Sequence, residues 1–131
     1  MLVRIRPELG AQLMREWGIP EWPEDVPDAE YWHFEGRGVF CIHPNEEGGI
    51  DGHMAMCPGF RHHSRRMCRE FIEKWGHLPI RVPIEISRRH VKNVVLKMGG
   101  FVESEPQEVP LIDGTTATVF FLRRLPYGQR N

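Results

Sequence analysis

The sequence predicts an α/β fold of the α+β kind, with a central mixed sheet flanked by helices. Three observations support it: strand-like runs fill the middle of the chain, two amphipathic helices follow, and one strand lies between those helices. A strand–helix–strand crossover implies parallel pairing, whereas short turns between successive strands imply antiparallel pairing. Both kinds of connection occur here, so we expect one sheet of mixed direction.

Hydrophobic periodicity and turn residues divide the chain into its expected elements. Apolar residues three or four apart mark helices, and β-prone runs between Gly-, Asn- or Pro-containing turns mark strands. The expected elements are a strand over Leu2–Arg6, a helix over Glu8–Trp17, strands over Tyr31–Phe34, Val39–His43 and Ile50–Cys57, a helix over His62–Trp75, a strand over Ile80–Ile86, a helix over Val91–Met98, and strands over Phe101–Glu105 and Thr116–Leu125. A proline-punctuated link and an Asp113-Gly114 turn precede the last strand. We expect a single domain over residues 1–131.

Two details of this pattern are specific enough to test. Leu9, Leu13 and Trp17 recur every four residues and predict the apolar face of the first helix. Residues 19–28 hold three prolines, which remove backbone donors and exclude regular structure. We expect this segment to be an ordered loop fixed by Trp22, or a flexible lid.

Composition excludes several functional classes. The 131 residues are 40% hydrophobic and 27% charged, with 17 basic and 18 acidic side chains and a formal charge of −1. Such a balance gives no overall case for binding nucleic acid or a membrane, so neither partner is expected. No apolar run approaches a membrane span, and the first residues lack the apolar core of a signal peptide. Three widely spaced cysteines form no disulfide framework, which favours a reducing, cytoplasmic location.

A basic cluster stands where a strand gives way to a helix. Pro58-Gly59 ends the strand, and unpaired N–H groups with the helix dipole favour an anion at such a helix start. The alternative is a solvated helix face without a ligand. The cluster comprises Arg61, His62, His63, Arg65, Arg66 and, one turn on, Arg69.

Four cysteine and histidine residues also raise the possibility of a zinc site. Cys41, His43 and His53 can share one face of adjacent strands, with Cys57 farther along, and thiolates and imidazoles are good zinc ligands. These spacings match no well-known zinc motif, and buried cysteines are common as small apolar side chains. No metal is therefore expected.

The central segment resembles the GNAT acyltransferases, and in size and style the chain is similar to small phage-encoded members. The resemblance covers residues 31–125. It rests on the order of elements and on two segments. The first is Met56-Cys57-Pro58 followed by Arg61-His62-His63-Ser64-Arg65-Arg66; the second is Leu96-Lys97-Met98-Gly99-Gly100-Phe101.

The resemblance implies an N-acyltransferase that transfers an acetyl group from acetyl-CoA to an amine by direct attack. The thioester would lie near Met56 and Cys57, where the strand-end backbone N–H would polarise its carbonyl. His53 would be the general base, with Glu85 a weaker candidate. The pyrophosphate would bind at the loop and helix start formed by Arg61, His62, His63, Ser64, Arg65 and Arg66. The acceptor, a small molecule or a protein, is unspecified, and a homodimer is left open.

Two departures from the family pattern favour an alternative. Ser64 and Arg66 stand where the family's phosphate loop has glycine and another small residue. Leu96 aligns near the family's usual tyrosine acid, and leucine has no proton to give. The alternative is therefore a non-catalytic protein of the same fold that acts in phage assembly or in binding a host protein.

Overall fold

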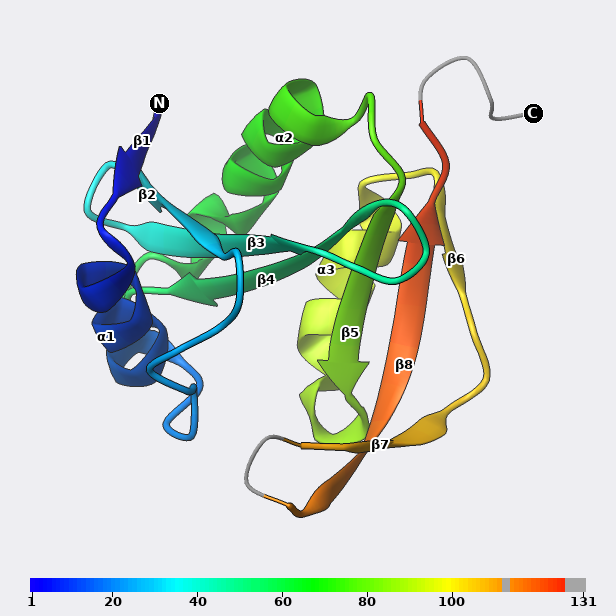
Figure 1. The fold of residues 1–131 in the computed structure, drawn as a ribbon. Helices are drawn as coiled ribbons and strands as arrows, with labels where there is room; N and C mark the ends of the chain where they lie inside the picture. Colours follow the sequence, from blue (N-terminus) through cyan, green and yellow to red (C-terminus); the bar gives the residue numbers. More distant parts are fainter. Residues whose placement is uncertain (112–113, 127–131) are drawn as a thin grey trace.

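The computed structural model describes residues 1–111 and 114–126. Within these residues one mixed sheet carries helices on both faces (Figure 1). The strands are β1 (Leu2–Ile5), β2 (Glu30–Phe34), β3 (Gly38–Pro44), β4 (Ile50–Met56), β5 (Ile80–Glu85), β6 (Phe101–Glu103), β7 (Gln107–Pro110) and β8 (Thr116–Arg124). The helices are α1 (Pro7–Trp17), α2 (Ser64–Trp75) and α3 (Arg89–Lys97), with single 3₁₀ turns before α2 and α3.

The sheet has the mixed topology that the sequence predicts. In the described part of the chain the strand order is β1-β2-β3-β4-β5-β8-β6, and β7 also pairs with β8. Among the strands that the structure describes, only the β4–β5 pair is parallel, and the other pairs are antiparallel. The antiparallel meander and the parallel crossover from β4 through α2 to β5 are thus confirmed.

The parallel pair between β4 and β5 is short, and the two strands then separate. Their register holds only at Ile50 opposite Ile80 and Asp51 opposite Arg81. Figure 1 shows β4 and β5 running on in clearly different directions. Pro83 lies in the part of β5 that has left β4, and proline offers no N–H to a neighbouring strand. The sheet is therefore open between the carboxyl ends of these strands.

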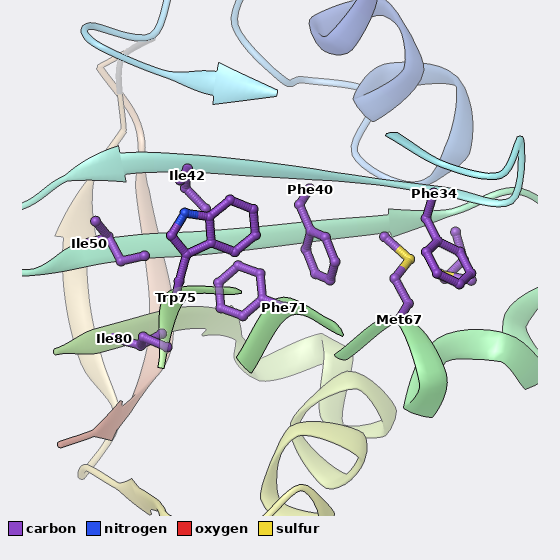
Figure 2. Close-up of a cluster of buried hydrophobic side chains, with 9 residues drawn as sticks. Phe34, Phe40, Ile42, Ile50, Met67, Phe71, Trp75 and Ile80 are labelled. Carbon is purple, nitrogen blue, oxygen red and sulfur yellow. The ribbon is translucent and has the colours of Figure 1, made fainter. Parts of the chain in front are cut away.

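The two faces of the sheet are covered differently. Phe71 and Trp75 of α2 pack against β3 and β4 (Figure 2), and Val95 of α3 packs against β5 and β8. On the opposite face, α1 and residues 19–28 cover β2, β3 and the end of β4. The helix predicted over His62–Trp75 is confirmed from Ser64 onward, and a 3₁₀ turn over Arg61–His63 precedes it. Burying an aromatic side chain of this size stabilises the fold by about 2–3 kcal/mol.

The predicted face of α1 is partly wrong. Leu9 is 42% exposed, whereas Gly10, Ala11 and Met14 are buried against the sheet. A Cβ atom at position 10 would overlap the ring of Tyr31, so only glycine lets the helix approach that ring. Small residues, rather than the leucine repeat, therefore decide which face of α1 is buried.

The predicted link before the last strand contains a strand instead. β7 pairs with β8 from Gln107 opposite Val119 to Pro110 opposite Thr116. The prolines on either side of this segment suggested irregular structure, but pairing with the long β8 overrides that local preference. Of the predicted Asp113-Gly114 turn, Asp113 lies outside the described residues.

Residues 19–28 form a loop fixed by Trp22, which is the first of the two structures expected for this proline-rich segment. Trp22 is 9% exposed, and its indole N–H donates to the Tyr31 hydroxyl oxygen at 2.9 Å. The Trp22 carbonyl accepts from Arg15 at 3.2 Å. These contacts tie the loop to both α1 and β2. No helix in the described part of the chain is long and apolar enough to cross a membrane.

Candidate active site

A cavity of about 1150 Å³ lies where β4 and β5 separate. Its walls come from β4, β5, α2, α3, the loop 19–28 and the strands β7 and β8. Because the sheet is open here, the cavity is reached by side chains from both faces of the sheet. Its position follows from the divergence after Asp51 and Arg81, since no strand among residues 1–111 and 114–126 pairs between β4 and β5 beyond that point.

One wall of the cavity is apolar. α2 contributes Cys68 and Phe71, α3 contributes Val91 and Val95, and Met98 follows directly after the end of α3. None of these α3 side chains carries a hydroxyl or an acid. Leu96 does not line the cavity and packs partly buried between α3 and the sheet. The side chains that α3 presents to the cavity are therefore apolar, as is Leu96, which stands near the position of the family's usual tyrosine acid.

The edge of β4 that β5 leaves presents backbone groups to the cavity region. Cys57 donates its N–H to Arg37 of the preceding turn at 2.8 Å, so that N–H points toward β3. Backbone groups alternate in direction along a strand, so the N–H groups of Met54 and Met56 point the other way, toward the open edge. The Cys57 N–H is therefore already bonded, whereas the Met56 N–H points toward the open edge. The expected position of the thioester near Met56 and Cys57 stays a prediction.

His53 lies on β4 and lines the cavity, as expected. Its side chain points to the α1 face of the sheet, where the Trp22 ring meets it edge-on at a centroid distance of 4.9 Å. Burial, reinforced by the nearby His43, lowers the pKa of His53 to about 4. The imidazole is therefore neutral near pH 7 and has a lone pair to accept a proton.

His43 on β3 lies directly beside His53. The two Nε2 atoms are 3.0 Å apart, and the rings stack with an interplanar angle of 16°. His43 Nδ1 is 3.2 Å from the Pro44 carbonyl oxygen. A carbonyl only accepts, so His43 Nδ1 carries the proton and, in the neutral ring, its Nε2 is an acceptor. His53 Nε2 then carries the proton shared between the rings, and His53 Nδ1 carries the lone pair.

A buried ion pair closes the narrow end of the cavity. Arg81 donates to both carboxylate oxygens of Asp51, at 2.6 and 2.9 Å, and its other terminal nitrogen reaches Glu46 at 2.7 Å. Arg81 is 9% exposed and Asp51 5%. The guanidinium is thus enclosed by carboxylates, which raises the pKa of Arg81. Sequence reasoning missed this pair because charged strand residues usually face solvent.

The same region holds a group of residue types that can bind metals. In the described ranges, ligand atoms of His43, Asp51 and His53 lie within 4.8 Å of one another. Cys41, part of the zinc hypothesis, is not in this group, and burial raises the pKa of its thiol to about 12. Both oxygens of Asp51 accept hydrogen bonds from Arg81, whose positive charge opposes a second cation beside it.

The basic cluster lies outside the cavity wall. A 3₁₀ turn over Arg61–His63 precedes α2, and Arg61, His62, Arg65 and Arg66 are exposed. Arg66 approaches Glu35 at 3.7 Å, which partly balances its charge. The cluster follows the carboxyl end of β4 in the chain, so it stands at the wide end of the opening between β4 and β5.

The remaining predicted residues fall into different places. Glu85 is exposed at the end of β5 and lines the cavity, on the far side from β4. The Met56 side chain is buried in the core with Met67, so only the Met56 backbone can contact a ligand. His63 and Ser64 are partly buried at the start of α2, and burial, reinforced by neighbouring positive charge, lowers the pKa of His63.

No protein-family model and no curated protein matches the chain. Solved structures do match. A spermidine N-acetyltransferase chimera from Vibrio cholerae and hSSAT aligns with a TM-score of 0.72 and 12% identity over 95% of this chain and 96% of that one. The Escherichia coli ribosomal-protein-S18-alanine N-acetyltransferase aligns with 0.69 and 10% over 98% and 96%. A Streptococcus pneumoniae acetyltransferase of the GNAT family aligns with 0.67 and 13% over 96% and 98%. The chain therefore has the fold of the GNAT N-acetyltransferases.

Proposed function

We propose that this protein is an N-acetyltransferase that moves an acetyl group from acetyl-CoA to an amine by direct attack. The observation that carries the proposal is the cavity between the diverging β4 and β5, which has a free strand edge on one side and neutral His53 in its wall. The likeness to solved N-acetyltransferases supports it at the level of the fold.

Three parts of acetyl-CoA have a suitable partner: the pantetheine amides, the thioester oxygen and the pyrophosphate. The amides of the pantetheine arm can pair with the backbone of Met54 and Met56, as an added strand would. One of these N–H groups can also stabilise the negative charge that develops on the thioester oxygen. The pyrophosphate can bind at the start of α2, where Arg61 and Arg65 are exposed.

His53 takes the proton that leaves the acceptor. A protonated amine gives one proton to His53 Nδ1, and the neutral amine then attacks the thioester carbonyl. When the carbon–sulfur bond breaks, the thiolate takes the excess proton from the attacking nitrogen, directly or through water, and the amide of a primary amine keeps its other N–H. This route needs no acid from α3, which is consistent with the apolar side chains that α3 presents.

The acceptor side of the cavity supports a positively charged amine. The loop 19–28 contributes Glu21 and Asp28 to its lining, and β5 contributes Glu85. Glu85 is proposed here as an attracting charge and a second, weaker base candidate. A cavity lined in this way does not favour the non-catalytic alternative. The phage origin, the cytoplasmic location and the homodimer stay predictions from the sequence.

A transfer assay tests the proposal. The protein is incubated with acetyl-CoA and a panel of primary amines, and N-acetyl products are detected by mass spectrometry. We expect product with at least one cationic amine, and a loss of about 10²-fold or more in turnover for His53→Ala with unchanged acetyl-CoA affinity. Failure of acetyl-CoA to bind at millimolar concentration would refute the proposal.

A further inference from the structure

We propose that His43 and His53, the histidine pair, form a two-step proton relay in which His43 receives the proton that His53 takes from the acceptor. The inference rests on the proposed function and adds His43 as a second catalytic residue. Its basis is geometric: two imidazoles on adjacent strands face each other through their Nε2 atoms at 3.0 Å.

The sheet register explains why the two rings meet. Cys41 lies opposite His53 and His43 lies opposite Asp51, so the two histidines are diagonal neighbours on one face of β3 and β4. Trp22 covers the outer side of the His53 ring at 4.9 Å. The histidine pair is therefore held by the strands beneath it and by the loop above it.

The hydrogen bond from His43 Nδ1–H to the Pro44 carbonyl gives the relay its direction. It leaves His43 Nε2 as an acceptor, so the proton between the rings resides on His53 Nε2. When the acceptor ammonium breaks its N–H bond and the proton joins His53 Nδ1, the Nε2 proton of His53 can pass to His43 Nε2. One proton has then moved from substrate to His43, and both His53 and the acceptor amine are neutral.

His43 gives that proton a route to solvent. Its side chain is 21% exposed, and its Nε2 lies 3.9 Å from an oxygen of Asp51, which is already paired with Arg81. The relay therefore removes positive charge from beside the reacting amine and releases it to water.

Several charged groups face the histidine pair and set its balance. From β4 comes the carboxylate of Asp51, and from β5 the guanidinium of Arg81. Glu46 on the β3–β4 turn offsets Arg81, and the loop 19–28 adds the carboxylates of Glu21 and Asp28 to the same cavity. Asp51 and Arg81 neutralise each other through two hydrogen bonds, so together they add no net charge beside the histidine pair.

The first test needs no substrate. Nitrogen-15 NMR of the histidine rings near pH 7.5 reports which ring nitrogen carries the proton. We expect His43 as the Nδ1–H tautomer and His53 as the Nε2–H tautomer, and we expect His43→Gln to change the titration of His53. Opposite tautomers, or a His53 titration that His43→Gln leaves unchanged, would overturn the relay whether or not the protein transfers acetyl groups.

The second test uses turnover. His43→Gln keeps an acceptor for the His53 N–H but cannot take its proton, so turnover should fall by about 10²-fold with acetyl-CoA affinity and melting temperature retained. His43→Ala should fall equally and regain activity when imidazole is added. His33→Ala, a strand histidine that contacts Trp17, is the control and should show neither effect.

Two outcomes of the second test count against the relay. Wild-type turnover in His43→Gln would show that His43 only fills space. Turnover that a chelator abolishes and zinc restores would show that the Nε2 atoms bind a metal instead, because a metal would occupy both lone pairs. Absence of turnover in the wild-type protein would refute the proposed function, and the NMR measurement would then decide on the relay alone.

Discussion

Stability should fall on mild acidification because of His53. The unfolded chain binds a proton on this histidine below about pH 6.5, whereas the folded protein does not until its pKa of about 4. Between these values the unfolded state binds more protons, so unfolding becomes easier as the pH falls. At about 1.4 kcal/mol per pKa unit, the full effect is about 3 kcal/mol, present above pH 6.5 and lost progressively toward pH 4.

Urea denaturation at several pH values measures this effect. His53→Gln removes the titrating group and keeps its approximate size, so the difference in unfolding free energy between wild type and variant isolates the histidine. We expect that difference to change by about 2–3 kcal/mol between pH 7.5 and pH 4, with the wild type losing more. Parallel curves for the two proteins would refute the claim that burial keeps His53 neutral.

Two further sets of variants test the buried ion pair and the basic cluster. Arg81→Met leaves Asp51 buried without its partner and should lower the unfolding free energy in urea denaturation by about 3–5 kcal/mol. Adding Asp51→Asn should recover most of that loss. A loss below about 1 kcal/mol in Arg81→Met alone would contradict the pairing. The double variant Arg61→Ala/Arg65→Ala should weaken acetyl-CoA binding about tenfold or more by calorimetry. Arg69→Ala, one turn farther along α2, should not, and equal losses in both would argue against a phosphate site at the helix start.

Local patterns predicted most of the fold because they describe burial directly. Phe71 and Trp75 stand one helical turn apart on the apolar face of α2, and both are buried as that spacing predicts. Tertiary contacts decided the exceptions. Leu9 is exposed because Gly10 allows α1 to approach Tyr31 on a different face, and such an approach has no signature in a single sequence.

The candidate site was predictable in part. Strand alternation placed His43 and His53 on one face, which the structure confirms, and their chemistry as a pair depends on a 3.0 Å approach that no spacing encodes. The buried pair of Asp51 and Arg81 carries no local signal, because the two residues are thirty positions apart and meet only where β4 touches β5. The free donor at Met54 could be inferred only once the register with β3 was known.

The central claim is that acetyl-CoA lies in the opening between β4 and β5, and backbone NMR tests it most directly. In a titration with acetyl-CoA, the amide resonances of Met54 and Met56 should shift saturably together with those of the first turn of α2, while the Cys57 amide, bonded to Arg37, should shift less. No saturable shift at millimolar acetyl-CoA, or shifts confined to surfaces away from β4, would contradict the account.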